Sequence, residues 1–574
     1  STAGMPSRFT QDRRRSRASA LRPRDVIGAI GRNRLVLVTG LAAAMPVIVS
    51  TIHAIGEGWL PLGDDAIIAV RSFDVLSTHP PLLGPYSTSS QVIGHPVLSP
   101  GPMLFWLLAL PVRLGELAPA ITIGIVNTAA VMGVVALARR RGGNALMLAT
   151  AAAVAVMCGS LDASIFSDVW GPSVSVLPFT LLIFLAWSLA CGEYRLLPVA
   201  ALVGSFVVQA HLTYVLPGAA LLAVGLGFLV AARPRAPRRW LVATLAVVLV
   251  CWSFPIAEEA VHRPGNVERI VQTATAGGPT LGGAAGWHAV ERAVGLPPWW
   301  LRPPRTPLDR VVEVTYGPRA PAQATVVLLL AALVAVAMGG FFARRRDLAA
   351  AALLALGLLA ALGVSTASTP TSHGLFAVVS YTLWWASPAG MFGWLVLGFA
   401  AATWAGAGAR LKALKARFAP PERARSRTAV ATAAGVLAVA AVGGVVAGAG
   451  EPDRLERLFA PARRIVDGVT AATPAGGAVL VQGSAGEIAT DLQGGVAYVL
   501  RRQGVPFVVS TLPGIGTRYD PGRNGHDRVM EVIERPQPTG TRGRVIARAV
   551  VSDVPANGSP LQRAARALVV TLAP

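Results

Sequence analysis

Long apolar runs separated by short arginine clusters are the feature that most constrains this chain. A helix needs about 20 apolar residues to cross a hydrocarbon core of about 30 Å. Eleven runs approach this length, so the sequence predicts a helical protein that crosses a membrane many times. They lie near residues 34–55, 119–138, 143–158, 173–191, 196–212, 214–232, 240–256, 322–342, 347–364, 388–407 and 429–449.

The composition agrees with a membrane protein and argues against other classes. The chain is 53% hydrophobic and only 14% charged, whereas soluble domains are about a quarter charged. Its net charge of +22 is spread over clusters between apolar runs, which favours membrane lipids over nucleic acid as the partner. The cysteines Cys158, Cys191 and Cys251 show no metal-ligand spacing, so neither disulfides nor a zinc site is predicted.

The arginine clusters predict a topology. Cytoplasmic loops of membrane proteins are enriched in arginine and lysine, and placing every cluster inside is compatible with eleven alternating spans. We therefore expect a bacterial plasma-membrane protein with a cytoplasmic N-terminus and an extracytoplasmic C-terminus. The clusters are 12–33, 139–141, 233–239, 344–346 and 410–427.

The remaining segments predict three parts. A basic cytoplasmic segment, 1–33, precedes a transmembrane domain at 34–449 with outer loops at 56–118 and 257–321. The apolar segment 101–114 contains two prolines and is too short for a span, so we expect an interfacial or re-entrant helix on the outer side.

The last part, 450–574, has the character of a soluble domain. Two short apolar runs, 478–484 and 506–512, are typical of buried strands, and an amphipathic helix is predicted between them at 487–503. The fold class expected from the whole chain is an all-α polytopic membrane protein of about eleven helices with a small α/β extracytoplasmic C-terminal domain.

An acidic pair, Asp64 and Asp65, follows the first predicted span. It begins a predicted amphipathic helix, where the helix dipole favours ionised carboxylates. Considered alone, the pair is explained by helix capping. Farther along this helix, Arg71 and Asp74 are three residues apart and are predicted to form a local ion pair.

The surrounding loop resembles the first outer loop of the GT-C superfamily, integral-membrane glycosyltransferases that use polyprenyl-phosphate sugars. In that superfamily an acidic pair follows the first span, and a Pro-rich turn and a second short helix come after it. Asp64 and Asp65 match the pair, and the segment from His95-Pro96 to Leu110 resembles the second element. The loop is most similar to uncharacterised actinobacterial membrane proteins with HPGP at this point, where this chain reads HPVLSPGP.

The resemblance implies transfer of a sugar, arabinofuranose or mannose, from a polyprenyl-phosphate donor to an envelope glycan, lipid or protein. It makes Asp64 the candidate base that takes the acceptor proton. Asp65 is expected to share that role, bind the acceptor or coordinate a divalent metal such as Mg²⁺, Mn²⁺ or Ca²⁺, and these alternatives stay open. The resemblance also implies that the transmembrane helices are arranged as in GT-C enzymes.

Other outer residues are candidates for substrate binding, each with an ordinary structural alternative. The two histidines of the first loop are equally explained as turn residues near the headgroups, and Trp170 is favoured as an interface residue. The arginines of the 257–321 loop suit a lipid phosphate, although a peripheral helix on anionic lipid explains them too. The candidates are His79, His95, Asp168, His211, Arg263, Arg302 and Arg305.

Two other function classes remain as alternatives to the enzyme. A transporter or flippase of a lipid-linked saccharide should show ionisable groups at mid-membrane or an inverted repeat, and neither is clear in the sequence. The second alternative is a non-enzymatic envelope assembly protein, in which the acidic pair would have no chemical role.

Overall fold

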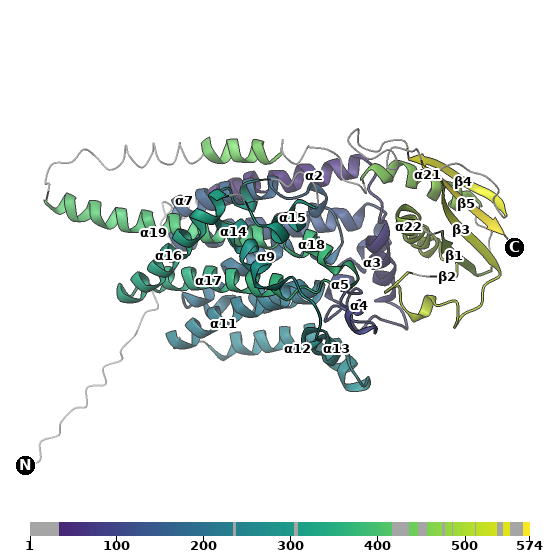
Figure 1. Cartoon of the computed structure of the whole chain (residues 1–574), viewed down its shortest axis with the longest axis horizontal. Coiled ribbons are helices and arrows are strands. Elements are labelled where there is room, and N and C mark those ends of the chain that lie inside the picture. The colour runs from purple at the N-terminus through teal and green to yellow at the C-terminus, as the bar shows by residue number, and fades with distance from the viewer. Residues whose placement is uncertain are drawn as a thin grey trace, which may run out of the picture.

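In the computed structural model, a bundle of long helices carries a small α/β unit at one end (Figure 1). The predicted basic segment 1–33 and part of the predicted eleventh span lie outside the described residues. The structure describes residues 34–233, 237–302, 308–318, 320–415, 435–445, 456–472, 477–484, 486–510, 512–535, 543–551 and 566–573.

The membrane part is helical because backbone groups in lipid must be hydrogen-bonded within their own segment. The long helices are α2 (Met45–Gly56), α7 (Ala118–Gly159), α9 (Val176–Ala190), α10 (Leu197–Ala210), α11 (Val215–Ala232), α12 (Arg238–Val261), α16 (Ala320–Phe342), α17 (Arg346–Ala367) and α19 (Ala386–Lys415). Shorter ones are α3 (Gly63–Asp74), α4 (Ser90–Ile93), α5 (Met103–Leu108), α6 (Pro111–Leu114), α8 (Gly171–Val174), α13 (Asn266–Thr275), α14 (Gly282–Val294), α15 (Asp309–Tyr316) and α18 (Val379–Thr382).

Within the described residues, seven helices are long and apolar enough to cross a membrane, or eight if a bent pair counts as one span. That pair is Arg34–Ala43 with α2, and its two helices meet at 54°. Two further predicted spans correspond to the shorter apolar helices Tyr194–Ala210 and Gly435–Val445.

Helix α7, 42 residues long, is a hairpin of two antiparallel helices. Its backbone leaves helical geometry at Gly142 and Gly143, where φ is −133° and +67°. The Asn127 amide donates to the carbonyl of Phe166 at 3.2 Å. A straight helix would carry the chain about 48 Å beyond Asn127, and the seven residues that follow it reach back only about 25 Å. The two predicted spans within α7 are therefore separate.

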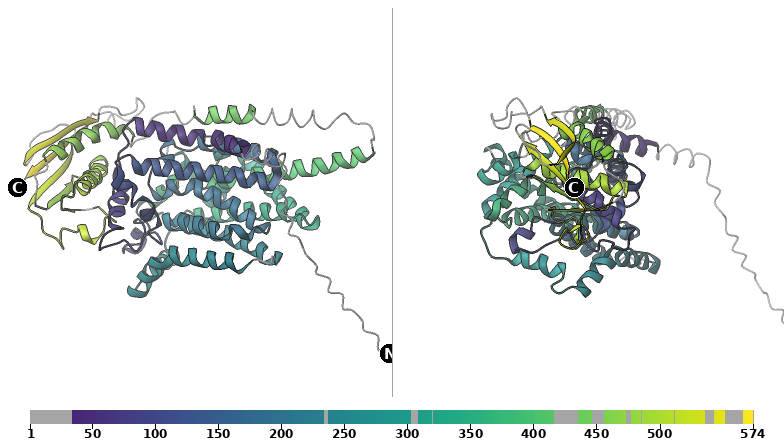
Figure 2. Two further views of the ribbon diagram at one scale, coloured as in Figure 1. Left: turned by 180° about the vertical axis from the view of Figure 1, so that it is seen from behind. Right: turned by 90° about the vertical axis from the view of Figure 1, so that its right-hand side faces the viewer.

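The turn within α7 and the turn between α16 and α17, which hold the clusters 139–141 and 344–346, lie at the end of the bundle away from the α/β unit (Figure 1). Arg141, at the α7 turn, forms an ion pair with Glu193, and the Trp187 indole donates to the carbonyl of Asp347 at 2.8 Å. The loops with the predicted site residues leave the opposite end, beside the α/β unit (Figures 1 and 2). All loops that matter for the site are thus on one side of the bundle.

Short helices form a layer between the bundle and the α/β unit. Helix α3 lies in this layer together with α4 and α5 (Figure 1). The predicted interfacial segment 101–114 is divided between α5 and α6, and the Arg113 guanidinium donates to the carbonyl of Phe73 at 2.6 Å. Asn266 of α13 holds the first loop through two hydrogen bonds of 2.9 Å to the backbone of Leu98.

The C-terminal unit is a mixed five-stranded sheet with two helices. The strand order is β2-β1-β3-β5-β4, parallel on the β2 and β1 side and antiparallel at β5. Helix α22 connects the parallel neighbours β1 and β2, as the sequence predicts. The elements are α21 (Glu456–Ala472), β1 (Val479–Gly483), α22 (Glu487–Gln503), β2 (Phe507–Val509), β3 (Arg528–Arg535), β4 (Arg544–Val551) and β5 (Arg566–Ala573).

The predicted fold class is confirmed: the chain is a mostly helical, multi-pass membrane protein with a small α/β unit at the C-terminal end.

Candidate functional site

Two loops bring three carboxylates together at the outer layer of the bundle. Gly63 begins α3 with a φ of +53°, which glycine adopts readily, and this places Asp64 and Asp65 in the first turn of the helix. The loop between α7 and α8 supplies Asp168. Residues about 100 positions apart in the sequence therefore share one acidic cluster.

Asp65 and Asp168 are hydrogen-bonded to each other. Two carboxyl groups can share a hydrogen bond only if one of them keeps its proton. Burial and the neighbouring carboxylates raise the pKa of Asp65 well above its usual value, and burial raises that of Asp168. The backbone N–H of Val169 donates to Asp65, and the Ser173 hydroxyl donates to Asp168 at 2.5 Å. These hydrogen bonds hold the pair in place, and the raised pKa values favour a proton shared between the two carboxyls.

Asp64 has different surroundings. Its side chain keeps accessible surface, although protein atoms crowd it closely enough that burial, followed by the charge of Asp168, raises its pKa. The helix N-terminus acts in the opposite direction and favours the ionised form. The indole N–H of Trp170 hydrogen-bonds to Asp64 and orients it. An accessible, oriented carboxylate with a raised pKa is suited to accept a proton.

An aromatic wall stands beside Asp64. Tyr381 lies 4.6 Å from Trp170 between ring centroids, and Trp384 lies 5.9 Å from Trp170. His211 meets Tyr381 edge-on at 6.1 Å. Burial lowers the pKa of His211 to about 4, so its ring is neutral near pH 7, and its Nδ1 accepts the Thr213 N–H. Such a wall offers apolar surface and polar edges to a ligand.

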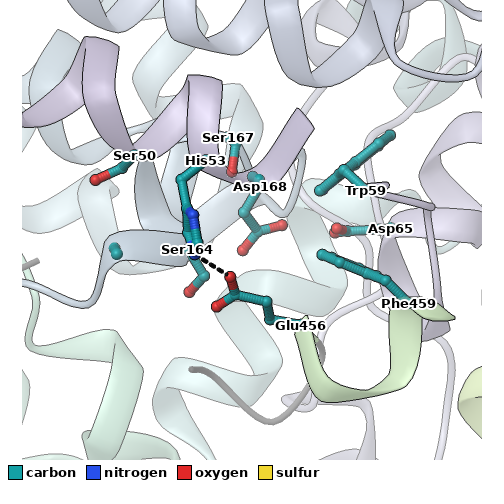
Figure 3. A pocket seen from close by; sticks show the side chains of 11 residues that line it. Ser50, His53, Trp59, Asp65, Ser164, Ser167, Asp168, Glu456 and Phe459 are labelled. Carbon is teal, nitrogen blue, oxygen red and sulfur yellow. Dashed lines mark ion pairs between the residues drawn. The ribbon is translucent and has the colours of Figure 1, made fainter. Parts of the chain in front are cut away.

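A pocket opens beside Asp65 and Asp168 (Figure 3). Asp65 and Asp168 face into it, and the rings of Trp59 and Phe459 flank Asp65. The ion pair of His53 and Glu456, 2.7 Å between Nε2 and Oε1, lies at its other side. Because Phe459 and Glu456 belong to α21, the C-terminal unit forms part of the pocket wall.

Arg310 of α15 is a buried cation that contacts the segment carrying Tyr381. It is only 3% exposed, and its Nε has no hydrogen-bond partner among the described residues. Its guanidinium lies 5.8 Å from the ring of Trp299 and 3.5 Å from the carbonyl of Ser380, the residue before Tyr381. The charge of Asp162 acts on it and also on Asp168. Burial lowers the pKa of Arg310 to about 10, so it stays charged at neutral pH.

The structure brings some predicted site residues together and leaves others apart. Asp168 and His211 lie beside the acidic pair, as described above. His79 is exposed and contacts Thr78, and His95 and Arg263 are exposed in loops, so none of these three joins the cluster.

The predicted arginine pocket also differs from the observed arrangement. Arg302 forms an ion pair with Glu313, whose Oε2 also accepts the Nε–H of Arg292 at 3.1 Å. Arg305 lies outside the described residues. Trp170, for which the sequence favours an interface role, also hydrogen-bonds to Asp64 in the structure.

Sequence reasoning missed Arg310 and Tyr381. Arg310 is in the same outer loop as the predicted arginines, and its short amphipathic helix, DRVVEVTY, was a usable signal. Tyr381 lies just before the Trp384-Trp385 pair and had no distinguishing pattern.

The acidic cluster does not fit a metal site. Among the residues that the structure describes, no group of three or more His, Cys, Asp or Glu side chains could hold an ion. The expected alternative in which Asp64 or Asp65 binds a divalent metal has no support in this geometry.

Comparisons with solved structures include two crystal structures of one protein. No family model matches the chain, and no curated protein sequence matches it. A crystal structure of ArnT from Cupriavidus metallidurans bound to undecaprenyl phosphate matches 94% of this chain and 98% of its own, with 13% identity and a TM-score of 0.49. The apo crystal structure of the same protein matches with 13% identity and a TM-score of 0.46, over 95% and 98% of the two chains.

Proposed function

We propose that this protein is a membrane glycosyltransferase that moves a sugar from a polyprenyl-phosphate donor to an envelope acceptor on the outer face. The observation that carries the proposal is Asp64: an accessible carboxylate, oriented by the Trp170 indole, beside an aromatic wall. The resemblance of the 56–118 loop to GT-C enzymes supports the same reaction.

In the proposed reaction, Asp64 takes the proton of the acceptor hydroxyl as that oxygen attacks the anomeric carbon. The bond from the anomeric carbon to the donor phosphate breaks, and the phosphate leaves with the electron pair. One carboxylate suffices for such an inverting transfer. The protonated pair Asp65 and Asp168 would hold the first turn of α3 in place.

We propose Arg310 as the group that stabilises the leaving phosphate. A guanidinium fork matches phosphate oxygens, and the unbonded Nε of Arg310 leaves hydrogen-bonding capacity for them. This replaces Arg302, whose partner is Glu313. The aromatic wall of Trp170, Tyr381 and Trp384 would then face the sugar.

A transfer assay with purified protein tests the proposal. Decaprenyl-phosphate arabinose and undecaprenyl-phosphate mannose, each radiolabelled, would be offered with an envelope glycan fraction as acceptor. We expect transfer from one donor and a loss of about 10² to 10⁴ in kcat for Asp64→Asn. Glu57→Gln, an exposed carboxylate at the end of α2, is the matched control and should retain parent activity. Equal transfer by Asp64→Asn and the parent would refute the proposed base.

A further inference from the structure

Helix α3, which carries the acidic pair, lies along α22 of the C-terminal unit. Figure 1 shows α22 between α3 and the sheet. The first turn of α3 meets the middle of α22, and its last residue meets the end of α22, so the two helices are neighbours over the whole length of α3. The contact is built differently at its two ends.

At the first end, two glycines of α22 permit close approach. A Cβ on Gly494 would lie 2.9 Å from the carbonyl oxygen of Gly63 and 3.1 Å from the Cβ of Ala66. A Cβ on Gly495 would lie 2.8 Å from a terminal methyl of Leu62. Backbone thus touches backbone at the turn that presents Asp64 and Asp65, where a single added methyl group has no room.

At the second end, the buried carboxylate of Asp74 receives four donors. Arg71, from α3 itself, donates at 2.7 Å, which confirms the ion pair predicted from the sequence. The C-terminal unit supplies the other three: Arg501 at 3.1 Å, Arg518 at 3.2 Å and the Tyr519 hydroxyl at 3.0 Å. Asp74 is completely buried, and three of its four donors are present only while the C-terminal unit stays docked.

Helix α21 adds a third contact that does not involve α3. Its residues Glu456 and Phe459 line the pocket into which Asp65 and Asp168 face. The Arg463 guanidinium, one turn farther along, donates to the carbonyls of Gly58 at 2.7 Å and of Trp59 at 3.0 Å, in the segment just before α3.

We propose that the C-terminal unit is a positioning part of the site, in which α22 fixes the place and tilt of α3 and thereby of Asp64 and Asp65. This rests on the proposed function. It differs from the idea of an appended domain that only binds an acceptor, because the unit contacts both ends of the helix that carries the base. Displacing a catalytic group by about 1 Å costs about 10² in rate, so a clamp of this kind would act on kcat.

Three glycine-to-alanine variants test the clamp, because all add the same methyl group. Gly494→Ala meets backbone, which cannot move aside, whereas Gly495→Ala meets the flexible end of Leu62. Gly525→Ala, in the same unit, has no neighbour within 4 Å and is the control. Alanine favours a helix by about 1 kcal/mol over glycine, so the two α22 variants do not weaken α22 itself.

We expect kcat to fall at least tenfold in Gly494→Ala, less in Gly495→Ala and not at all in Gly525→Ala, with the KM for the donor within twofold of the parent. The acid limb of the pH–rate profile should also move to lower pH in Gly494→Ala, since displacement gives Asp64 more water. Loss of folded protein would instead lower the rate by the same factor at every pH and leave the acid limb at the same pH.

The proposal is overturned if folded Gly494→Ala keeps the parent kcat and pH profile. If Gly494→Ala does not fold, Asp74→Asn replaces it, because this variant loosens the other end of α3 without adding volume. There, too, kcat should fall at unchanged donor KM, and parent kinetics would overturn the proposal. An inactive parent protein would instead contradict the proposed function, so the two failures are distinguishable.

Discussion

Asp64 and Asp65 are adjacent in the sequence but have different chemistry because the helix points them to different neighbours. Asp64 keeps accessible surface and contacts an indole, whereas Asp65 is 5% exposed and shares a hydrogen bond with Asp168. A proton acceptor must be reachable by its substrate, and for this reason we propose Asp64 as the base and Asp65 as its support. The sequence alone left these roles open.

The pH dependence of the rate should reflect Asp64. The carboxylate acts as a base only when ionised, so kcat/KM should fall as the pH drops through its raised pKa, above the ordinary 3.8. The charge of Asp168 contributes to that rise. We therefore expect Asp168→Asn to move the acid limb of the profile to lower pH, measured between pH 4 and pH 8. A limb that stays in place or moves up would contradict this assignment.

The protonated state of Asp65 should be visible in stability. Its folded-state pKa is raised, so the stabilisation by its neutral form is complete below pH 3.8 and is lost as the pH rises through the folded value. Asp65→Asn keeps a donor for Asp168 and removes the titration. We expect its melting temperature to decline less than that of the parent between pH 5 and pH 8. Parallel declines in both proteins would show that Asp65 does not titrate in this range.

Arg310 and Arg302 make opposite predictions for donor binding. A hydrogen bond to a charged group contributes about 1.5–3 kcal/mol, so Arg310→Gln should raise the KM for the polyprenyl-phosphate donor roughly tenfold or more. Arg310→Lys should fall between that variant and the parent, because it keeps the charge and loses the planar fork. Arg302→Gln, whose native partner is Glu313, is the comparison and should change KM little. A larger effect at Arg302 would restore the arginine pocket expected from the sequence.

At the scale of elements, the sequence predicted what depends on local pattern. Long apolar runs indicated the helices, and two apolar segments around an amphipathic one indicated β1, α22 and β2. The glycine pair at 142 and 143 separates the two spans of α7, where the arginines had already required a turn. Such features follow from the pattern of apolar residues within about 20 positions, because this pattern decides whether a segment is buried in the bilayer or in a sheet.

Contacts between residues far apart in the chain could not be predicted from the sequence. The hydrogen bond of Asp65 with Asp168 and the contact of Asp74 with Arg501 join segments about 100 and more than 400 residues apart. The sequence around one residue of such a contact does not indicate which distant residue it will meet. Trp170 was assigned to the interface for this reason, because a lone tryptophan in an outer loop indicates nothing about the carboxylate it meets.

The contact between α3 and the C-terminal unit predicts a difference between two carboxylates. Asp74 is fully buried and its arginine partners are partly exposed, so Asp74→Asn weakens charge-assisted hydrogen bonds and should cost about 1.5–3 kcal/mol of docking or folding free energy. Glu116 pairs with Arg463 and Arg502 at partly exposed positions, and Glu116→Gln should cost about 1 kcal/mol or less. Chemical denaturation of both variants, monitored by proteolysis of the C-terminal unit, measures the ranking. Equal losses would contradict the difference in burial.

At the scale of the whole molecule, the two ends of the bundle differ in charge and in chemistry. In the part of the chain that the structure describes, one end has the clusters 139–141 and 344–346, and the other has the acidic cluster, the aromatic wall and the α/β unit. Positive residues are retained on the cytoplasmic side of membranes. A polyprenyl-phosphate donor with its sugar on the outer face would therefore meet the site without crossing the bilayer.

This polarity predicts a pattern of cysteine labelling. Arg523, in the α/β unit, and Arg140, at the turn of α7, are well exposed, with side chains 69% and 59% accessible. In a background with Cys158, Cys191 and Cys251 replaced by alanine, Arg523→Cys should react with a membrane-impermeant maleimide in intact cells. Arg140→Cys should react only after permeabilisation or in inverted vesicles. The reverse pattern would place the site on the cytoplasmic face, where the donor would have to be a lipid-linked sugar of the inner leaflet, and would contradict transfer on the outer face while leaving the chemistry of Asp64 intact.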